Sequence, residues 1–398
     1  MKTYIYNDTS FPVGMATTKR ISCYARGLLA NGMDVLVVPY RKSFEYKQQN
    51  GVKDQGSYDG IEYEYPSGCF KRNKHNKILR FYDWEVGDAL RGACHILRNV
   101  KNDDIVFIYV HSVFAQLVLM MASCIKHAKI VKEICEHPSA LCNMNKLGNR
   151  IARWFEYNFI FPCYDGFVPI SRDLDMFVSQ YKKKTAKTVV VPILVEDSLF
   201  NIDFTTHQSL YKVPYIIHTG TMLEPKDSIS KIIKAFALYK KKHPSNIRLV
   251  FTGPHANDSC SYIPLMNELG VRSDIDLLGL VSMTEVAVLQ HYSALTIIYK
   301  SDNLQTRNCF PTKLGEMLMS GTPVITTTIG DANLYLKNGE SAFIIEPDDE
   351  SRLIQCIDFL LSNPQQAKVM GEKGRQVAQE CFSPVYQGKK LTHFFKNL

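Results

Sequence analysis

One stretch of this sequence combines residue types at a spacing that suits anion binding. Within residues 310–325, Pro311 is followed at once by Thr312 and Lys313, and Glu316 comes three residues later. A proline that begins a helix leaves the first-turn N–H groups free, so these amides, the Thr312 hydroxyl and the Lys313 ammonium would converge on one point. That combination suits a diphosphate. The Glu316 carboxylate, one turn further along the same face, would suit the two hydroxyls of a ribose, whereas the alternative is a capped core helix.

Three further candidates lie at expected strand ends in the first half of the chain. Gly14 closes the turn 7–14 and would let backbone amides approach a ligand closely, although a plain strand-to-helix turn explains it equally well. His111 and His137 each follow an expected strand and would face the same crevice of an open sheet. An imidazole there, or a carboxylate near it, would suit a substrate that carries hydroxyl groups, and a structural histidine is the alternative.

The composition is that of an ordinary globular protein. The chain has 398 residues, of which 45% are hydrophobic and 22% charged, and this excludes disorder, collagen-like repeats and coiled coil. Its 11 cysteines contain no CxxC pair and no metal-ligand spacing, so we expect reduced thiols in a cytoplasmic protein. The longest apolar run, 113–122, is far shorter than the roughly 20 residues of a membrane span, and no signal peptide opens the chain.

The net charge of +8 is unevenly distributed. Residues 1–200 carry +7 and the remainder +1. A basic first half could contact anionic lipid, nucleic acid or a phosphorylated substrate, or could be no more than a solvated surface. A nucleic-acid-binding protein is disfavoured, because no recognised binding motif is present and the charge excess is modest.

The elements that must position these residues alternate along the chain. Short β-branched runs alternate with helical stretches, which indicates parallel sheets covered on both faces, and the alternation restarts after Pro192. We therefore predict two Rossmann-like domains with a boundary near residue 200. Residues 41–78 break the pattern and are expected to form a surface loop or binding flap. The expected strands are 4–6, 34–38, 105–110, 129–134, 166–170, 188–191, 215–218, 247–251, 275–278, 295–299, 323–326 and 342–345.

The stretch 310–325 resembles the signature of retaining GT-B glycosyltransferases, specifically sequence family 4 (glycosyl transferases group 1), in the branch with a PxKxxE motif. Elements in the same order elsewhere resemble the same family, among them the first-half loop and helix around Gly14 and Arg20 and the stretch 218–226. The resemblance implies an α/β GT-B fold, with two Rossmann-like domains facing across a cleft. Residues 1–200 would form the acceptor-side domain, 201–382 the nucleotide-sugar-binding domain, and the C-terminal helix, about 383–398, would pack back on the first.

The resemblance also assigns roles to individual residues. His137 matches the family's first-domain histidine near the transferred sugar, and Lys226 its phosphate-binding lysine, so these two are the catalytic candidates. The donor-binding candidates are Gly14, Gly220, Thr221, Lys226, Gly253, Val281, Asn308, Pro311, Thr312, Lys313 and Glu316.

Two positions depart from the family pattern. The family's EX7E pair lacks its first glutamate, since Asn308 occupies that position, which affects recognition of the donor sugar. The usual glycine-arginine after the first donor-domain strand is Gly220-Thr221, so one cation that would neutralise the diphosphate is missing. Arg307 is a candidate to replace it.

The implied reaction transfers a sugar from a nucleotide-diphosphate sugar to a hydroxyl of a glycan or lipid-linked acceptor, with retention of configuration and without a metal or other cofactor. The implied setting is bacterial surface polysaccharide or lipopolysaccharide synthesis. The chain would act in the cytoplasm, with peripheral contact to the anionic inner face of the membrane through the basic and aromatic residues of 70–84. The alternatives are a sugar-nucleotide epimerase, which the 311–316 motif disfavours, and a catalytically inactive relative that binds a nucleotide-sugar or a partner transferase.

Overall fold

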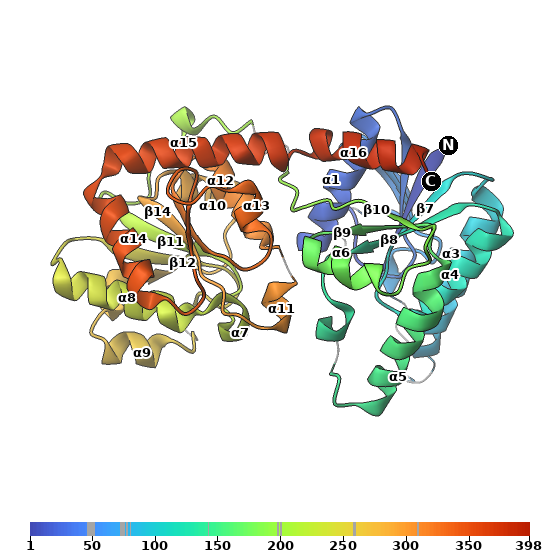
Figure 1. The fold of residues 1–398 in the computed structure, drawn as a ribbon, viewed down its shortest axis with the longest axis horizontal. Coiled ribbons are helices and arrows are strands. Elements are labelled where there is room, and N and C mark those ends of the chain that lie inside the picture. Colours follow the sequence, from blue (N-terminus) through green and yellow to red (C-terminus); the bar gives the residue numbers. More distant parts are fainter. Residues whose placement is uncertain are drawn as a thin grey trace. The chain divides into compact units, whose positions relative to one another are not determined.

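The computed structural model describes the chain except for residues 46–51, 72–75, 77, 78, 80, 142, 197, 198, 200, 258, 259 and 309. It divides into two compact units, each with its own sheet (Figure 1). The first unit contains Met1–Pro192 and Pro384–Leu398, and the second contains Ile193–Ser383. The division thus falls after Pro192, where the sequence predicted a boundary near residue 200.

The first unit is built on an eight-stranded sheet in the order β10-β9-β8-β7-β1-β2-β5-β4. All neighbouring strands run parallel except the β4–β5 pair. The central strands are apolar runs buried throughout because helices cover both faces. The bounds are β1 Lys2–Asn7, β2 Asp34–Pro39, β4 Gln55–Tyr58, β5 Ile61–Glu64, β7 Ile105–Tyr109, β8 Lys129–Ile134, β9 Gly166–Pro169 and β10 Lys187–Thr188.

Helices α1 (Ala16–Ala30) and α16 (Pro384–Lys396) pack together in the first unit (Figure 1). A Cβ atom added at Gly388 would lie 2.3 Å from the carbonyl carbon of Gly27, so the two helix backbones touch where both residues are glycine. The last helix of the chain is therefore a part of the first unit. The unit's other long helices are α3 Asp88–Asn99, α4 Val113–Ile125, α5 Leu147–Phe155 and α6 Arg172–Ser179.

The insert 41–78 is not simply a surface loop, so that prediction was wrong for part of it. Strand β5 pairs parallel with β2 and antiparallel with β4, and β3 (Phe44–Glu45) pairs with β6 (Phe70–Lys71). The physical reason is a short alternating pattern: Ile61 and Tyr63 are buried, whereas Glu62 between them is exposed.

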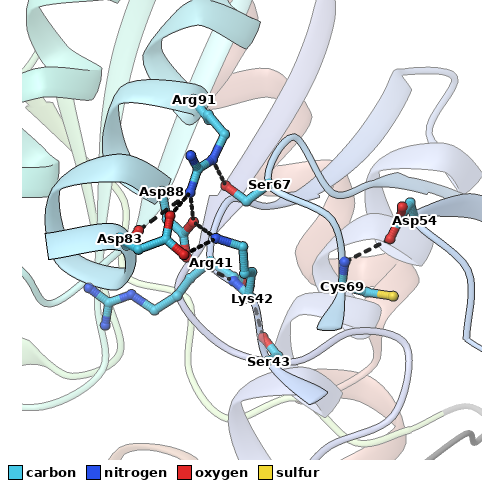
Figure 2. Close-up of polar contacts among 9 residues, drawn as sticks. All are labelled: Arg41, Lys42, Ser43, Asp54, Ser67, Cys69, Asp83, Asp88 and Arg91. Atoms are coloured by element: carbon cyan, nitrogen blue, oxygen red, sulfur yellow. Dashed lines mark hydrogen bonds and ion pairs between the residues drawn. The ribbon is translucent and has the colours of Figure 1, made fainter. Parts of the chain in front are cut away.

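A buried ion cluster fixes the start of this insert (Figure 2). The Lys42 ammonium lies 2.7 Å from the Asp88 carboxylate and 3.1 Å from that of Asp83, and the Arg91 guanidinium binds both carboxylates. Arg91 also donates to the Ser67 hydroxyl. Since 3% of the Lys42 side chain and none of the Asp88 side chain is exposed, the cluster holds two insert segments on the first turns of α3.

The second unit is built on a six-stranded, all-parallel sheet in the order β13-β12-β11-β14-β15-β16. Alternate strand residues face opposite layers: Ile216 packs into the core beneath α8 (Ile229–Lys242) and α14 (Glu350–Ser362), whereas Ile217 packs toward α10 (Met283–His291). The bounds are β11 Tyr215–Thr219, β12 Arg248–Thr252, β13 Ile275–Leu277, β14 Leu295–Ile298, β15 Val324–Thr327 and β16 Phe343–Ile345.

Each sheet has one point where the strand order reverses. In the first unit the chain passes from β1 to β2 and later resumes on the other side of β1 with β7. In the second it passes from β11 to β12 and β13 and then resumes on the other side of β11 with β14. Ligands of open α/β sheets bind outside the carboxyl ends of the strands at such a point. The carboxyl ends of β1 and β7, and those of β11 and β14, are therefore the expected ligand-binding positions.

Candidate functional site

Three consecutive loops stack on one another at the carboxyl edge of the second sheet. The Gly253 N–H donates to the Gly279 carbonyl over 2.7 Å, and the Gly220 N–H donates to the Thr252 carbonyl over 3.1 Å. Gly253 has a φ of +135°, and a Cβ atom there would lie 1.8 Å from the Gly220 carbonyl oxygen. Only glycine satisfies both conditions, so Gly253 sets how closely the loops after β11 and β12 approach.

A buried polar group lies at the β11/β14 switch point. The Lys300 ammonium, just beyond β14, is 2.5 Å from one oxygen of the Asp227 carboxylate. The Thr221 hydroxyl, in the loop after β11, donates to the other oxygen over 2.9 Å. The exposed fractions of the Lys300 and Asp227 side chains are 11% and 6%. The ion pair is therefore largely shielded from water. It connects the segment that follows β11 with the segment that follows β14.

The electrostatics of this group follow from its burial. Burial alone would raise the pKa of Asp227, but the charges of Lys300 and His218 and the hydrogen bonds from Lys300 and Thr221 lower that pKa to about 2. The pKa of His218 is lowered, chiefly by burial. Its Nδ1 contacts the Ile297 carbonyl at 2.9 Å, and its Nε2 is buried with no hydrogen-bond partner among the residues that the structure describes. The group therefore contains an ionised carboxylate and one imidazole nitrogen with unused hydrogen-bonding capacity.

Helix α12 (Thr312–Met319) begins where the sequence analysis placed an anion-binding turn. Pro311 is its N-cap residue, and no side chain in the described part of the chain caps the helix N-terminus. The Lys313 ammonium lies 3.0 Å from the Glu316 carboxylate, with 39% and 13% of the two side chains exposed. Hence the two groups that the sequence assigned to different parts of a nucleotide are paired with each other in the free chain.

The remaining donor-site candidates lie around this group in the second unit. Lys226 is half-buried in the one-turn helix α7 (Glu224–Asp227), directly before Asp227. Val281 is half-buried in the loop after β13, where it packs against the apolar layer beneath α10. Asn308 follows α11 (Leu304–Arg307) and precedes α12.

Arg307 does not take the place of the missing family arginine. Its guanidinium binds the Asp302 carboxylate, with an Nη2–Oδ2 distance of 2.7 Å, and 62% of its side chain is exposed. The buried cation that shares a carboxylate with Thr221 is Lys300 instead. Sequence reasoning missed Lys300 and Asp227, because Lys300 belongs to no motif and the two residues are 73 positions apart. A lysine directly after a buried apolar strand was the one signal available.

The first-unit candidates lie at the carboxyl edge of the first sheet. A Cβ atom at Gly14 would lie 2.0 Å from the Thr18 hydroxyl oxygen, which itself donates to the Ser10 carbonyl, so the loop closes tightly on α1. His137 follows β8, and its ring lies 4.3 Å from the Phe177 ring. Its Nδ1 accepts the Ser139 N–H, and burial lowers its pKa. A neutral His137 therefore carries its proton on Nε2 and can donate it to a hydroxyl oxygen.

A small cavity also opens beside His111 and Glu136 in the first unit, with the Lys132 ammonium bound to the Val110 carbonyl in its wall. Its volume of about 20 Å³ is enough for about one water molecule.

Two features are absent from the described residues. Across that part of the chain, no three His, Cys, Asp or Glu side chains gather as metal ligands would. None of its helices combines the length and the hydrophobicity that crossing a bilayer requires.

Comparison with known proteins places part of this chain among glycosyl transferases by similarity. Residues 205–377 match the family described as glycosyl transferases group 1. The matched residues all lie in the second unit. The matched range includes all the second-unit candidates named above, from Gly220 to Glu316.

Among curated relatives, trehalose synthase of Pyrococcus horikoshii is 23% identical over 175 residues, which are 42% of this chain and 40% of that protein. The alignments with four such relatives span 16% to 41% of the relatives' own lengths. Each of these four alignments therefore covers less than half of this chain and less than half of the relative.

Solved structures match the fold over the whole chain. Anabaena HepE in complex with UDP and glucose is 14% identical with a TM-score of 0.71, and each chain is covered fully. WaaG, a glycosyltransferase involved in lipopolysaccharide biosynthesis, is 13% identical with a TM-score of 0.65, again with full coverage of both chains. The chain therefore has the GT-B fold that these structures share.

Proposed function

We propose that this chain is a retaining glycosyltransferase that moves a sugar from a nucleotide-diphosphate sugar to a hydroxyl of a glycan or lipid-linked acceptor. The observation that carries the proposal is the polar group at the β11/β14 switch point, within the stretch that matches group 1 glycosyl transferases. The close backbone approach at Gly253, the Lys300 and Lys313 ammonium groups and the N-terminus of α12 would each favour a diphosphate.

The chemical task of this site is to stabilise the negative charge that develops on the departing diphosphate. Lys226, the Thr312 hydroxyl and amide, and Lys313 supply preorganised positive charge and hydrogen-bond donors for it. Protein cations thus take the part that a metal plays elsewhere, and the reaction proceeds without a metal ion. The leaving phosphate takes the proton of the acceptor hydroxyl, His137 contacts a hydroxyl of the transferred sugar, and no protein nucleophile is used.

Nucleotide binding must separate the Lys313–Glu316 pair. With 39% of the Lys313 side chain exposed, the pair contributes at most about 1 kcal/mol, as exposed ion pairs generally do. A ribose whose two hydroxyls donate hydrogen bonds to the Glu316 carboxylate, and a diphosphate that accepts hydrogen bonds from the Lys313 ammonium, more than offset that loss. The pair therefore holds both side chains near the site until the donor replaces it.

The test is a screen of UDP, GDP, ADP and CMP and their common sugar conjugates by thermal shift. A ligand at a hundred times its Kd stabilises the fold by about 2.7 kcal/mol. Lys226→Ala and Glu316→Ala are each expected to cost about 2–4 kcal/mol of donor binding or transition-state stabilisation. Glu340→Ala is the matched control, since Glu340 pairs with Lys337 at the same i,i+3 spacing on an exposed surface.

The outcomes separate the enzyme from its inactive alternative. Nucleotide binding together with release of the nucleotide from its sugar supports the transferase. Binding without any turnover favours a relative that only holds a nucleotide-sugar or a partner transferase. Near-normal binding and turnover in both Lys226→Ala and Glu316→Ala would remove the donor-site assignment.

For the acceptor side we propose peripheral contact with an anionic membrane in bacterial polysaccharide or lipopolysaccharide synthesis. In the 70–84 segment, Phe81 and Tyr82 are exposed, whereas Arg72, Lys74, Lys77 and Arg80 lie outside the described residues.

Helix α5 adds a second surface that suits a lipid interface. Leu147, Ile151 and Trp154, at i, i+4 and i+7, are all more than half exposed on one face. Lys146 and Arg150 flank that face, and residues 137–155 contain no acidic residue. An exposed apolar face beside basic residues is typical of a helix that lies in the headgroup region.

A further inference from the structure

The switch point of the first sheet holds a polar pair that the donor chemistry does not use. Asp8 directly follows β1, and His111 comes two residues after β7. The two strands are parallel neighbours, with Asn7 opposite Tyr109, so their carboxyl ends bring these side chains together across 103 residues of sequence. This is the position at which an open α/β sheet binds its ligand.

The Asp8 carboxylate contacts His111 at two points, the backbone and the imidazole ring. One oxygen accepts the His111 backbone N–H over 2.9 Å, and the other lies 3.3 Å from Nδ1 of the ring. Burial alone would raise the pKa of Asp8, but the hydrogen bonds from His111 and the charge of Arg41 lower it. The ionised carboxylate therefore holds the ring proton on Nδ1. Nε2, on a side chain that is 41% exposed, keeps its lone pair.

The surroundings favour a neutral, hydroxyl-bearing ligand over an anion. The Glu85 carboxylate accepts the Ser112 hydroxyl over 3.3 Å and pairs with Arg41 at 2.9 Å. The Arg41 guanidinium in turn lies over the Trp84 ring, 4.4 Å from its centroid. Two carboxylates near the imidazole would repel a phosphate, whereas they and Nε2 can accept hydrogen bonds from hydroxyl groups.

We propose that the Asp8–His111 pair binds the acceptor: Nε2 of His111 accepts a hydrogen bond from a sugar hydroxyl, and Asp8 fixes the tautomer that makes this possible. This rests on the proposed function. His137, whose Nδ1 accepts the Ser139 N–H, offers a hydrogen-bond donor at Nε2 instead. His111 and His137 thus present opposite hydrogen-bonding capacities to two different hydroxyls, and Asp8 is the positioning residue of the Asp8–His111 pair.

The experiment uses the full chain with ¹⁵N-labelled histidine and a panel of octyl glycosides of glucose, galactose, mannose and N-acetylglucosamine. In the wild type we expect the ¹⁵N shifts of His111 to report a proton on Nδ1 and to move when a glycoside binds. In Asp8→Asn, the amide oxygen of the asparagine still accepts the His111 backbone N–H, so its NH₂ group faces Nδ1 of the ring. The ring proton then moves to Nε2, and the KM for the glycoside rises about tenfold, the equivalent of one hydrogen bond.

Two substitutions of His111 provide an independent test. His111→Gln places an amide oxygen near the position of Nε2 and should retain most of the glycoside affinity. His111→Asn reaches only the position of Nδ1 and should raise the glycoside KM about tenfold. Nucleotide affinity should be unchanged in all three variants. His127→Asn, an exposed position with φ of +53° that asparagine tolerates, is the control for altering a histidine of the same unit.

The outcomes distinguish this inference from the proposed function. If the wild type binds nucleotide but no glycoside shifts His111, the acceptor role is overturned and the transferase proposal stands. The same holds if Asp8→Asn and His111→Asn keep wild-type KM values. If no nucleotide binds to the second unit, the proposed function fails, and the acceptor assignment fails with it.

Discussion

Replacing Lys300 with methionine tests the polar group at the β11/β14 switch point directly. The substitution keeps the length of the side chain and its apolar packing but removes the ammonium that lies 2.5 Å from Asp227. Asp227 then keeps only the Thr221 hydroxyl at 2.9 Å and the neighbouring His218. A buried carboxylate would thus lose the cation that balances its charge.

The size of the effect follows from the pKa of Asp227. Lowering that pKa from 3.8 to about 2 corresponds to about 2.5 kcal/mol of stability at neutral pH. Loss of one partner of a buried ion pair costs about 3–5 kcal/mol, because the remaining charge is desolvated. We therefore expect Lys300→Met to destabilise the second unit by about 3 kcal/mol at pH 7.

The sign of the pH dependence distinguishes wild type from variant. In the wild type the folded-state pKa of Asp227 is depressed, so its contribution is complete above about pH 4 and is lost as the pH falls toward 2. In Lys300→Met, burial raises that pKa above its usual value, and protonation relieves the unpaired charge. The stability difference between the two proteins should therefore shrink as the pH is lowered from 7 to 4.

Amide hydrogen exchange followed by mass spectrometry is the suitable assay. Both tryptophans, Trp84 and Trp154, lie in the first unit, so intrinsic tryptophan fluorescence does not report on the second. Peptides that cover β11 and β14 should exchange faster in Lys300→Met. Asp227→Asn added to that variant should recover at least about 2 kcal/mol, because the amide keeps a hydrogen bond with Thr221 and carries no charge. Unchanged exchange in the single variant, or no recovery in the double variant, would refute the reasoning.

Three further predictions follow from other contacts. Gly253→Ala should destabilise the second unit by more than about 3 kcal/mol and abolish nucleotide binding, since its Cβ would lie 1.8 Å from a carbonyl oxygen; Gly270→Ala, with positive φ but open space, is the control and should cost about 1 kcal/mol. Arg20→Met should cost the first unit about 3–5 kcal/mol in tryptophan-monitored urea unfolding, because Arg20 binds the buried Glu133 at 2.8 Å. Trp154→Ser should weaken co-flotation with anionic vesicles severalfold, and equal binding to zwitterionic vesicles would argue against the charge component.

Controls for these variants use the same measurements. If Gly253→Ala and Gly270→Ala had equal stability, the close approach of the two loops would not be the constraint. Arg20→Met combined with Glu133→Gln should recover part of the loss, and no recovery would mean that the ion pair is not its source. Wild-type flotation by Trp154→Ser would direct attention to Phe81 and Tyr82 instead.

Much of the architecture was predictable from local sequence. The apolar run 129–134 coincides with β8, and the proline before Thr312 coincides with the start of α12. Two parallel sheets in a GT-B fold followed from this alternation and from the family motif, because strand burial and helix capping are encoded within a few neighbouring residues. The short strands β4 and β5 were not predicted. Each has four residues, and in β5 only Ile61 and Tyr63 mark the buried face, which is too short an alternation of apolar and polar residues to identify a strand.

The tertiary structure alone decided which side chains meet. Lys300 and Asp227 are 73 residues apart, and His111 and Asp8 are 103 apart. Each pair forms because a strand-order reversal makes β14 the neighbour of β11 and β7 the neighbour of β1. The PxKxxE motif at 311–316 and the replacement of the family's arginine by Thr221 could be read from the sequence. That Lys300 lies buried and shares the Asp227 carboxylate with Thr221 could not. Local periodicity specifies each strand, whereas the contacts at strand ends depend on strand order, which long-range packing determines.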